Sequence, residues 1–456
     1  MTVQTSLQGI AKRAARDKQH RFGNLYTMLN QEMLLDSWRF IRKDAAYGVD
    51  RVSAGEYEQN LEANIQDLVE RLKRKAYRAK LVRRQYIPKG EGGERPLGIP
   101  ATEDKLLQLA VKRILEAIYE PDFLKCSYGY RPKVGAREAV HDLTVKLQFG
   151  NYHYVVEADI KGFFDHVDHE WMIRMLQERV NDRALLRLIQ KWLKAGVLEK
   201  DGQVIHPAAG TPQGGVISPI PWTDRQDRLA NITLHHVLDL WFQKVVKKRC
   251  RGEACLIRYA DDFVTAFERQ EDAERFHQEL PERLEKFGLE LSAAKTRVIP
   301  FHRDPPSGGS RFEFLGFEFS WGKDHQGRPH LKRRTARKRL WASLVRFAQW
   351  CRAVRHLELR ELIRALNAKL RGYYNYYGVV GNYESLETFF RQALRILFKW
   401  LNCRSQRPSY TWQGFTALLA YYRVEKPRIV WPSGRRATSA LPACLRKRVS
   451  LKSPVR

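Results

Sequence analysis

The chain has 456 residues, which is enough for about two to four domains with hydrophobic cores of their own. Lys and Arg outnumber Asp and Glu by 81 to 51, and the resulting net charge of +30 favours a polyanionic partner such as nucleic acid. No apolar run reaches the roughly 20 residues of a membrane helix, no signal peptide is recognisable, and the six cysteines include no Cys-x-x-Cys pair, so a membrane protein, a secreted disulfide scaffold and a zinc ribbon are disfavoured. We therefore expect a protein of the reducing cytoplasm, free or associated with the nucleoid.

Residues 1–75 are expected to form a helical, basic N-terminal extension. Near its end, apolar residues recur at helical spacing; they are Leu61, Ile65, Leu68 and Leu72. A basic run leads from there into a strand, a glycine-rich turn and a second strand over residues 86–100. Lys89 and Arg95 flank the turn, and such a pair of cations suits a clamp on a triphosphate, because Arg makes bidentate phosphate contacts. The alternative for the basic run is a solvated helix face.

Helices with buried faces are predicted for residues 103–119 and then up to about residue 147. A short apolar strand over residues 152–157 follows, and Asp159 stands at its end. Asp165 and Asp168 have a different predicted role, as loop residues or N-cap groups of a helix that starts at His169.

A loop rich in glycine and proline occupies residues 210–219. Gln213 in this loop can form a hydrogen bond with a template base or an incoming nucleotide. The consecutive glycines that begin at Gly214 allow the backbone to approach a ligand closely. An ordinary glycine turn explains the same residues equally well.

The most informative stretch is residues 255–267, where two short apolar runs flank the sequence Tyr-Ala-Asp-Asp. This pattern predicts a β-hairpin whose turn holds Asp261 and Asp262. Adjacent carboxylates repel each other beside buried strands, but a hard divalent cation such as Mg²⁺ would stabilise them. If the strand before Asp159 neighbours this hairpin, the three acids form the site that a two-metal nucleotidyl transferase requires. A solvated acidic turn is the alternative.

The remaining sequence adds further candidates for substrate and nucleic-acid contacts. Lys295 follows a helix that ends near Gly288 and is placed to face a triphosphate. Residues 311–319 alternate about a glycine turn and predict a strand pair. From Lys332 onward the chain is predicted to be helical, basic and aromatic, with tyrosines that either stack on bases or pack between helices. Residues 430–456 contain no acid and are expected to be partly disordered without their partner.

Taken together, six blocks of this sequence resemble the group II intron-encoded reverse transcriptase/maturase family. The blocks are Arg95-Pro-Leu-Gly-Ile-Pro100, Ala158-Asp-Ile-Lys-Gly-Phe-Phe-Asp165, Thr211-Pro-Gln-Gly-Gly-Val-Ile-Ser-Pro219, Arg258-Tyr-Ala-Asp-Asp-Phe-Val264, Phe314-Leu-Gly-Phe317 and Gly372-Tyr-Tyr-Asn-Tyr-Tyr-Gly378. They occur in the family's order and cover most of residues 40–425. The resemblance implies an α+β right-hand polymerase fold, in which fingers and an antiparallel palm sheet are followed by an α-helical thumb/maturase domain.

The resemblance also implies a function. Members of the family are RNA-directed DNA polymerases that help their intron RNA fold and splice and then copy it into DNA from a target-site primer. The implied partners are group II intron RNA, an RNA template with a DNA primer, target DNA and dNTPs. The implied cofactors are two Mg²⁺ ions, for which Mn²⁺ can substitute. A homodimer is left open, since the sequence does not fix the oligomeric state.

By this resemblance, specific residues acquire roles. Asp159, Asp261 and Asp262 are the catalytic metal ligands, with a further contribution from Ile160. Phe164 corresponds to the gate that excludes a ribose 2′-hydroxyl, and Gln213 lies beside the nascent base pair. The primer grip corresponds to Phe314, Leu315, Gly316 and Phe317. The RNA-binding candidates in the helical region are Arg333, Arg334, Arg337, Lys338, Arg371, Tyr373 and Tyr374.

The implied domains are an N-terminal extension (1–75), fingers and palm (76–325), a thumb/maturase domain (326–428) and a basic nucleic-acid-binding tail (429–456). Two features depart from the family pattern. The paired cysteines of an HNH nuclease are missing, so we expect no endonuclease. Residues 221–228 also intervene before the Leu-Ala-Asn helix, and Pro221 would break or delay that helix.

Two other functions remain open at this stage. A reverse transcriptase recruited to host defence or repair would carry the same catalytic blocks. An RNA-binding splicing factor with an inactive polymerase could result from the insertion at residues 221–228. Primer extension on an RNA template would separate the second alternative from an active polymerase.

Overall fold

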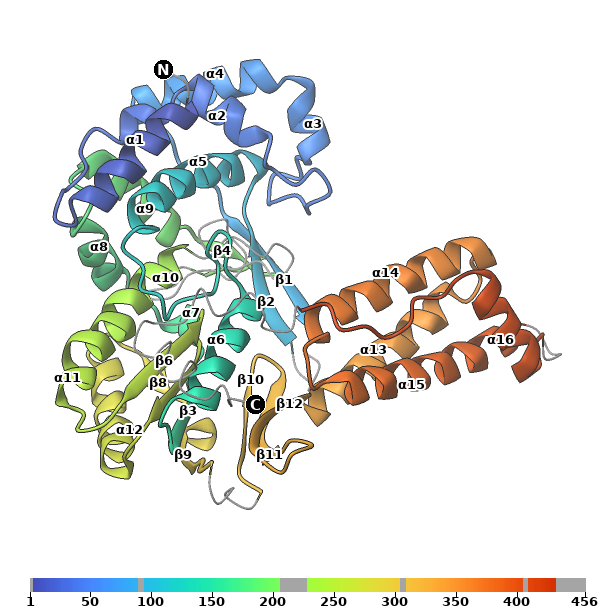
Figure 1. The fold of residues 1–456 in the computed structure, drawn as a ribbon. Helices are drawn as coiled ribbons and strands as arrows, with labels where there is room; N and C mark the ends of the chain where they lie inside the picture. Colours follow the sequence, from blue (N-terminus) through green and yellow to red (C-terminus); the bar gives the residue numbers. More distant parts are fainter. Residues whose placement is uncertain (1–2, 89–93, 206–227, 304–308, 405–408, 432–456) are drawn as a thin grey trace. The chain divides into compact units, whose positions relative to one another are not determined.

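A computed structural model describes residues 3–88, 94–205, 228–303, 309–404 and 409–431. The chain divides into two compact units (Figure 1). Unit 1 contains Met1–Ala139 and Val156–Val298, and unit 2 contains Val140–Val155 and Ile299–Arg456. Within the described residues, no helix is both long and apolar enough to cross a membrane.

Helices form the N-terminal part of unit 1 (Figure 1). They are α1 (Val3–Arg16), α2 (Gln31–Trp38), α3 (Ala54–Gln59), α4 (Leu61–Lys73) and α5 (Thr102–Tyr119). The predicted helices at 61–72 and 103–119 are confirmed. Ser53 begins α3 with a capping box in which Glu56 is the reciprocal partner. Helix α5 is buried over most of its length and packs against α1 and α2, so it is the central helix of this part.

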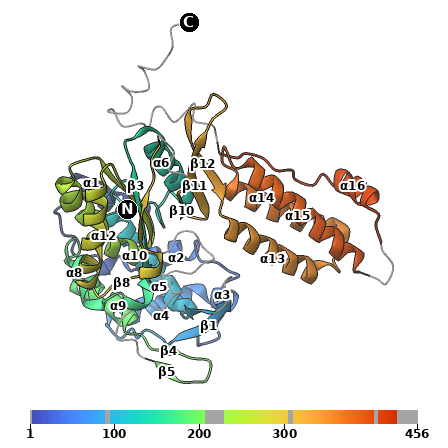
Figure 2. The same cartoon turned by 90° about the horizontal axis from the view of Figure 1, so that it is seen from below.

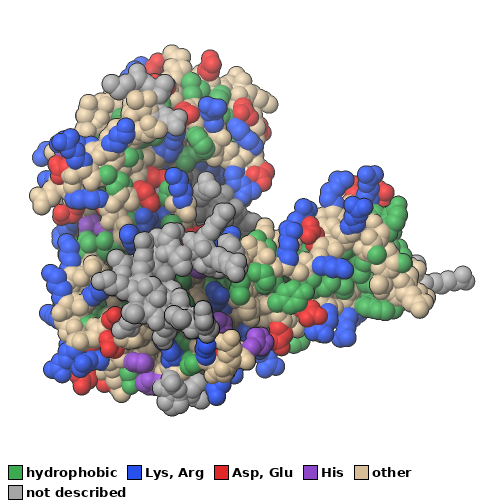
Figure 3. All heavy atoms as spheres, in the orientation of Figure 1, with side chains coloured by type: hydrophobic (Ala, Val, Ile, Leu, Met, Phe, Trp, Pro, Cys, Tyr) green, Lys and Arg blue, Asp and Glu red, His purple; other side chains and the backbone are tan. Residues whose placement is uncertain are grey.

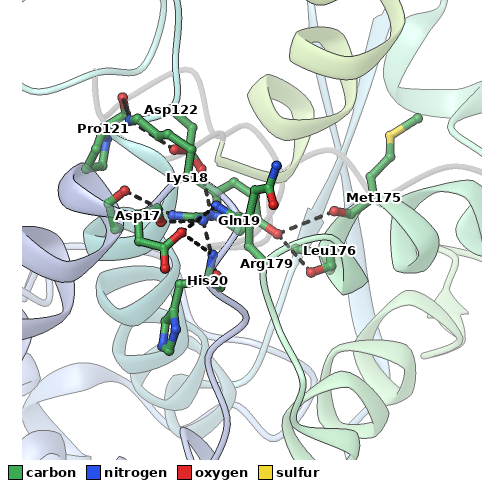
Figure 4. Close-up of polar contacts among 11 residues, drawn as sticks. Asp17, Lys18, Gln19, His20, Pro121, Asp122, Met175, Leu176 and Arg179 are labelled. Carbon is green, nitrogen blue, oxygen red and sulfur yellow. Dashed lines mark hydrogen bonds and ion pairs between the residues drawn. The ribbon is translucent and has the colours of Figure 1, made fainter.

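A buried arginine connects the end of α1 with other segments of unit 1 through hydrogen bonds and an ion pair (Figure 4). Arg179 is 4% exposed, forms an ion pair with Asp122 at 2.9 Å, and donates to the backbone carbonyls of Ala14, Asp17 and His20. Lys18 donates to the carbonyl of Pro121 at 2.6 Å. Chain segments that are distant in sequence are therefore held together by charge-assisted hydrogen bonds.

The predicted strand pair at residues 86–100 is confirmed. Strand β1 (Val82–Pro88) pairs antiparallel with β2 (Glu94–Ile99), and the sheet continues through β4 (Val197–Leu198) to β5 (Val204–Ile205). The turn that contains Lys89 lies outside the described residues.

The sheet that carries the acidic motifs has the order β6-β7-β3-β8, and β9 also pairs with β3. Its strands are β3 (Tyr154–Lys161), β6 (Ala254–Tyr259), β7 (Asp262–Phe267), β8 (Glu290–Leu291) and β9 (Arg297–Pro300). The predicted first strand is too short: β3 continues two residues past Asp159. It does so because Ile160 and Lys161 pair with Leu291 and Glu290 of β8, a partner that the local sequence does not reveal.

Helices of unit 1 complete the surroundings of this sheet. They are α7 (Phe163–His166), α8 (His169–Gln177), α9 (Arg183–Leu193), α10 (Arg228–Leu234), α11 (Lys247–Arg249) and α12 (Gln270–Glu285), with the π-helical segments η2 (His235–Asp239) and η3 (Phe242–Val246). Asp168 caps α8 as predicted, because its side chain accepts a hydrogen bond from the backbone of Trp171. The predicted effect of Pro221 on the start of α10 lies outside the described residues.

Unit 2 combines a three-stranded antiparallel sheet with long helices. The strands are β10 (Arg311–Phe314), β11 (Phe317–Lys323) and β12 (Pro329–Thr335). Helices α13 (Arg337–Val354), α14 (Leu359–Tyr377) and α15 (Tyr383–Asn402) lie side by side, followed by α16 (Trp412–Tyr421) (Figures 1 and 2). Helix α6 (Ala136–Phe149) contributes its residues from Val140 onward.

The predicted start of the helical region at Lys332 is wrong. Lys332, Arg333 and Arg334 lie on strand β12 and do not open a helix. Leu331 and Thr335 are buried on this strand, so it has an apolar side, but the intervening basic residues hide that pattern in the sequence.

Candidate active site

Strand β3 presents a partly exposed row of charged side chains on one face and a buried row on the other. Ala158 and Ile160 are buried, whereas Glu157, Asp159 and Lys161 point to the other face. Each of these three forms an ion pair: Arg297 contacts Glu157 at 3.0 Å, Lys295 contacts Asp159 at 2.7 Å, and Glu290 contacts Lys161 at 3.1 Å. The row is therefore a charged surface built on a buried strand.

Asp159 is held in this row by both its backbone and its side chain. Its carbonyl accepts a hydrogen bond from the backbone of Ser292 at 2.8 Å. The ammonium of Lys295 donates to its Oδ2, while the Asp159 side chain keeps 27% of its surface exposed. Sequence reasoning placed Lys295 near the triphosphate, which stays a prediction, and did not anticipate its ion pair with Asp159.

The predicted acidic hairpin is confirmed. Strands β6 and β7 pair antiparallel, with Tyr259 opposite Asp262, so that Ala260 and Asp261 form a two-residue loop. Ala260 has φ 56°, in the left-handed region that non-glycine residues rarely adopt. Asp261 is partly exposed and Asp262 is exposed, although the rest of β7 is buried.

The predicted neighbourhood of the acids is also confirmed, because β7 lies next to β3 in the sheet. The structure does not bring the acids into a closed ligand set: among the described residues, no group of three or more His, Cys, Asp or Glu side chains is arranged to hold a metal ion. The chemistry of Asp159, Asp261 and Asp262 nevertheless fits a hard divalent cation, since all three offer carboxylate oxygens. The ammonium beside Asp159 shows that this carboxylate lies where positive charge is stabilised.

Two adjacent phenylalanines follow Asp159 on α7. Phe163 is 1% exposed and Phe164 is 9% exposed, and their rings meet edge to face at 5.1 Å between centroids. The assignment of Phe164 as the sugar gate stays a prediction.

Several predicted substrate contacts cannot be located. Lys89, Gln213 and Gly214 lie outside the described residues. The backbone of Arg95 is on β2, opposite Ile87, close to the end of the hairpin. Their roles as triphosphate or template contacts stay predictions.

In unit 2, the predicted strand pair around a glycine turn is confirmed. Phe314 and Phe317 face each other across β10 and β11, and both are buried. Leu315 and Gly316 form the loop, both with positive φ, which matches a tight two-residue hairpin. The hydroxyl of Tyr376 donates to the carbonyl of Leu315 at 3.0 Å.

The predicted RNA-binding residues of unit 2 differ in accessibility. Arg337 and Lys338 are exposed on α13, which contains no acidic residue. Arg334 and Arg371 are exposed but form ion pairs with Glu384 and Glu425. Figure 3 shows Lys and Arg side chains on the visible faces of both units.

The tyrosine prediction needs correction. Tyr374 is fully buried in the helical core and donates its hydroxyl to the carbonyl of Glu425, so it packs rather than stacking on RNA. Burial correspondingly raises the pKa of Tyr374 above that of a free tyrosine. Tyr373 is partly buried and stacks on Phe389 at 3.7 Å between ring centroids.

Comparison with known proteins agrees with this geometry. Residues 87–319 match the family described as "Reverse transcriptase (RNA-dependent DNA polymerase)", and residues 344–416 match "Group II intron, maturase-specific domain". The chain is 28% identical to the group II intron-encoded protein LtrA of Lactococcus lactis subsp. cremoris over 83% of this chain and 75% of LtrA. It is 32% identical to protein YkfC of Escherichia coli K12 over 58% of this chain and 75% of YkfC. An uncharacterized 91 kDa protein in the cob intron of Schizosaccharomyces pombe is 26% identical over 80% of this chain and 52% of that protein.

The fold and the acidic hairpin thus define a nucleic-acid polymerase of the reverse transcriptase class, an RNA-directed DNA polymerase with an α+β fold. The maturase-specific match narrows this class. The chain belongs to the group II intron-encoded reverse transcriptase/maturase family. Its reverse transcriptase relatives use divalent metal ions, and its maturase region implies nucleic-acid substrates that include intron RNA.

Proposed function

We propose that this protein copies RNA into DNA with Mg²⁺ as its cofactor and with Asp159, Asp261 and Asp262 as the metal ligands. The observation that supports this assignment is the adjacency of β7 and β3, which places three acids in one sheet. The backbone of Ile160 is a further candidate ligand. When bound, two divalent ions supply activation of a primer 3′-hydroxyl and stabilisation of the leaving pyrophosphate.

The other residues of the site would bind and orient the substrates. Lys295 lies against Asp159 and can neutralise this carboxylate when no metal is bound. Lys89, Arg95, Gln213 and Gly214 are proposed to contact the incoming dNTP and the template. Phe164 is proposed to lie against the sugar of that nucleotide.

Unit 2 is proposed to bind the primer and the intron RNA. The β10–β11 hairpin, from Phe314 to Phe317, is the candidate primer grip. The exposed cations of β12 and of the acid-free helix α13 are the candidate RNA contacts. The chain would then consist of an extension (1–75), fingers and palm (76–325), a thumb/maturase domain (326–428) and a basic tail (429–456), with target DNA as a further substrate.

The decisive experiment is primer extension on an RNA template with Asp261→Asn and Asp262→Asn. Each substitution keeps the side-chain shape but removes a charge that holds a hard cation. We expect a rate loss on the order of a thousandfold, since metal catalysis contributes several kcal/mol. Asp168→Asn is the matched control, because Asn also caps helices well, and its rate should be unchanged.

Retained extension in either hairpin variant would contradict the assignment. A wild-type protein that binds intron RNA but extends no primer would instead support the inactive splicing factor.

A second prediction concerns sugar selection. Phe164→Ala should raise ribonucleotide incorporation relative to deoxynucleotides by roughly tenfold to a hundredfold, because desolvating an unpaired hydroxyl against carbon costs about 1–3 kcal/mol. Phe163→Ala, at a more deeply buried ring, should lower the melting temperature without altering this ratio. Ratios of ATP to dATP incorporation would measure both effects. A shift for Phe163→Ala alone would place the gate one residue earlier, and a shift for neither would remove it.

A further inference from the structure

A buried arginine lies directly behind the acidic hairpin. Arg258 and Asp239 are both 0% exposed. The guanidinium contacts the carboxylate through two parallel bonds, from Nε to Oδ1 at 2.7 Å and from Nη2 to Oδ2 at 2.6 Å. Such a bidentate pair adds geometric specificity as well as energy.

The remaining donors of Arg258 are also used. Nη1 donates to Oδ1 of Asn231 at 2.9 Å and to the carbonyl of Ala260 at 3.0 Å, and Nη2 donates to Oγ of Ser127 at 2.8 Å. With the two bonds to Asp239, all five N–H groups of the guanidinium therefore have acceptors. One of these acceptors belongs to the loop that carries Asp261.

The Ala260–Asp261 loop contains a strained residue, so contacts from the rest of the fold must stabilise it. Ala260 has φ 56°, and a non-glycine residue in this region costs about 1–2 kcal/mol. Strained residues of this kind persist only where the surrounding contacts fix them. The bond from Arg258 to the Ala260 carbonyl acts on the strained residue itself.

A second segment, residues 126–129, packs against the same loop. The backbone N–H of Arg258 donates to Cys126 and its carbonyl accepts from Tyr128, at 2.7 and 2.8 Å. A Cβ on Gly129 would lie 2.4 Å from the backbone nitrogen of Ala260, so only glycine permits this close approach. Asn231 donates to the carbonyl of Gly129 at 2.6 Å and thereby links this segment to Arg258.

General stability does not account well for this network. A buried ion pair is often no more stabilising than apolar side chains of similar size, because both charges must leave water. Burial alone would raise the pKa of Asp239, but the charge of Arg258 outweighs it and holds that pKa below its usual value, so the pair stays ionised. Asp239 also lies in the π-helical segment η2, a geometry that is frequent at functional sites.

We propose that Arg258 is a positioning residue of the polymerase, which fixes the Ala260–Asp261 loop so that Asp261 and Asp262 face the metal ions in one orientation. Asp239, Asn231 and Ser127 hold the guanidinium for this purpose. The inference rests on the proposed role of Asp261 and Asp262 as metal ligands. Arg258 contacts no substrate in this scheme and acts only through the hairpin.

The test compares Arg258→Lys with Arg179→Lys. Lysine keeps the charge but cannot form the bidentate, five-donor arrangement. Arg179 is the matched control, since it is also a buried arginine paired with an aspartate and bonded to backbone carbonyls, but it contacts α1 (Figure 4). Both variants are measured as full-length protein, well below their melting temperatures.

Three readouts separate positioning from stability: kcat for primer extension, KM for dNTP, and Mn²⁺ affinity without substrate, followed by electron paramagnetic resonance. Both variants should lower the melting temperature. Only Arg258→Lys should lower kcat and Mn²⁺ affinity, by roughly tenfold to a hundredfold, the range for residues that orient metal ligands. KM for dNTP should change little, because Arg258 touches no substrate.

The proposal would be overturned if both variants had a lower melting temperature but normal kcat and normal Mn²⁺ affinity per folded molecule. If Arg258→Lys does not fold, the same measurements on Ser127→Ala test the proposal. This substitution removes a single acceptor of Arg258 and leaves the ion pair with Asp239 intact. Unchanged kcat and Mn²⁺ affinity in Ser127→Ala would then overturn it. Asp261→Asn in the same assays distinguishes the two failures: if it stays active, the metal-ligand assignment is wrong, and if it is inactive while Arg258→Lys is normal, only the positioning role is wrong.

Discussion

The β6–β7 hairpin of unit 1 and the β10–β11 hairpin of unit 2 have loops of equal length but different supports. Each loop contains two residues, and each contains a non-glycine residue with positive φ, Ala260 in one and Leu315 in the other. In unit 1, a buried guanidinium and a neighbouring segment hold the loop. In unit 2, the second loop residue also has positive φ but is Gly316, and the loop carbonyls accept hydrogen bonds from Tyr376 and from the backbone of Ala336.

The two loops therefore differ in their backbone: the unit 2 loop has two residues with positive φ, one of them a glycine, whereas the unit 1 loop has one such residue and no glycine. A glycine makes a tight turn inexpensive from within the loop. A non-glycine loop depends on long-range contacts, which also restrict how the loop can move. The unit 1 loop, which has no glycine, suits a turn that must hold carboxylates in a fixed orientation.

Among substitutions in the two loops, the larger effect on stability is expected for Gly316→Ala. The glycine has φ 77°, where a side chain costs about 1–2 kcal/mol, and the new Cβ would lie 2.9 Å from the hydroxyl of Tyr377. Gly327→Ala is the matched control, because Gly327 has φ 76° but nothing within 4 Å of the added Cβ. Urea denaturation should show a loss of stability for both and a larger loss for Gly316→Ala. Equal losses would mean that Tyr377 moves aside without cost.

Among substitutions in the two loops, the smaller effect on stability is expected for Ala260→Gly. Glycine removes the strain at φ 56°, about 1–2 kcal/mol, but it adds about 0.4–1 kcal/mol of unfolded-state entropy. Stability should therefore stay within about 1 kcal/mol of wild type or rise slightly, the opposite sign to Gly316→Ala. A clear loss of stability in the same denaturation experiment would show that the Ala260 methyl group contributes packing that outweighs the strain.

The sequence predicts the parts of this molecule that have local signals. The acidic hairpin, the strand pair at residues 311–319 and the helices with periodic apolar faces are all confirmed. Strand β12 was missed because three consecutive basic residues separate its two buried positions. Tyr374 was assigned to RNA because a tyrosine cluster does not reveal which rings a neighbouring helix covers.

In the candidate site, too, the local features could be predicted from the sequence and the long-range contacts could not. The order of the acids along the chain predicts that they share a sheet, but the ion pair between Lys295 and Asp159 depends on tertiary structure. Arg258 carried one available signal, a charged residue inside an otherwise apolar strand. Its partners Asp239 and Ser127 lie far away in sequence, so only the folded chain identifies them.

Unit 2 is built from two segments that lie far apart in the sequence, and this affects how it folds during translation. Val140–Val155 belongs to this unit, although the rest of the unit begins at Ile299. Within it, Gln148 accepts from the backbone of Leu331, and Phe301 donates to the carbonyl of His153. On the ribosome, this segment emerges long before its partners, and unit 2 cannot complete its structure until the chain beyond Ile299 has been translated. For the same reason, a gene fragment that encodes only the C-terminal part would transfer this unit without one of its helices.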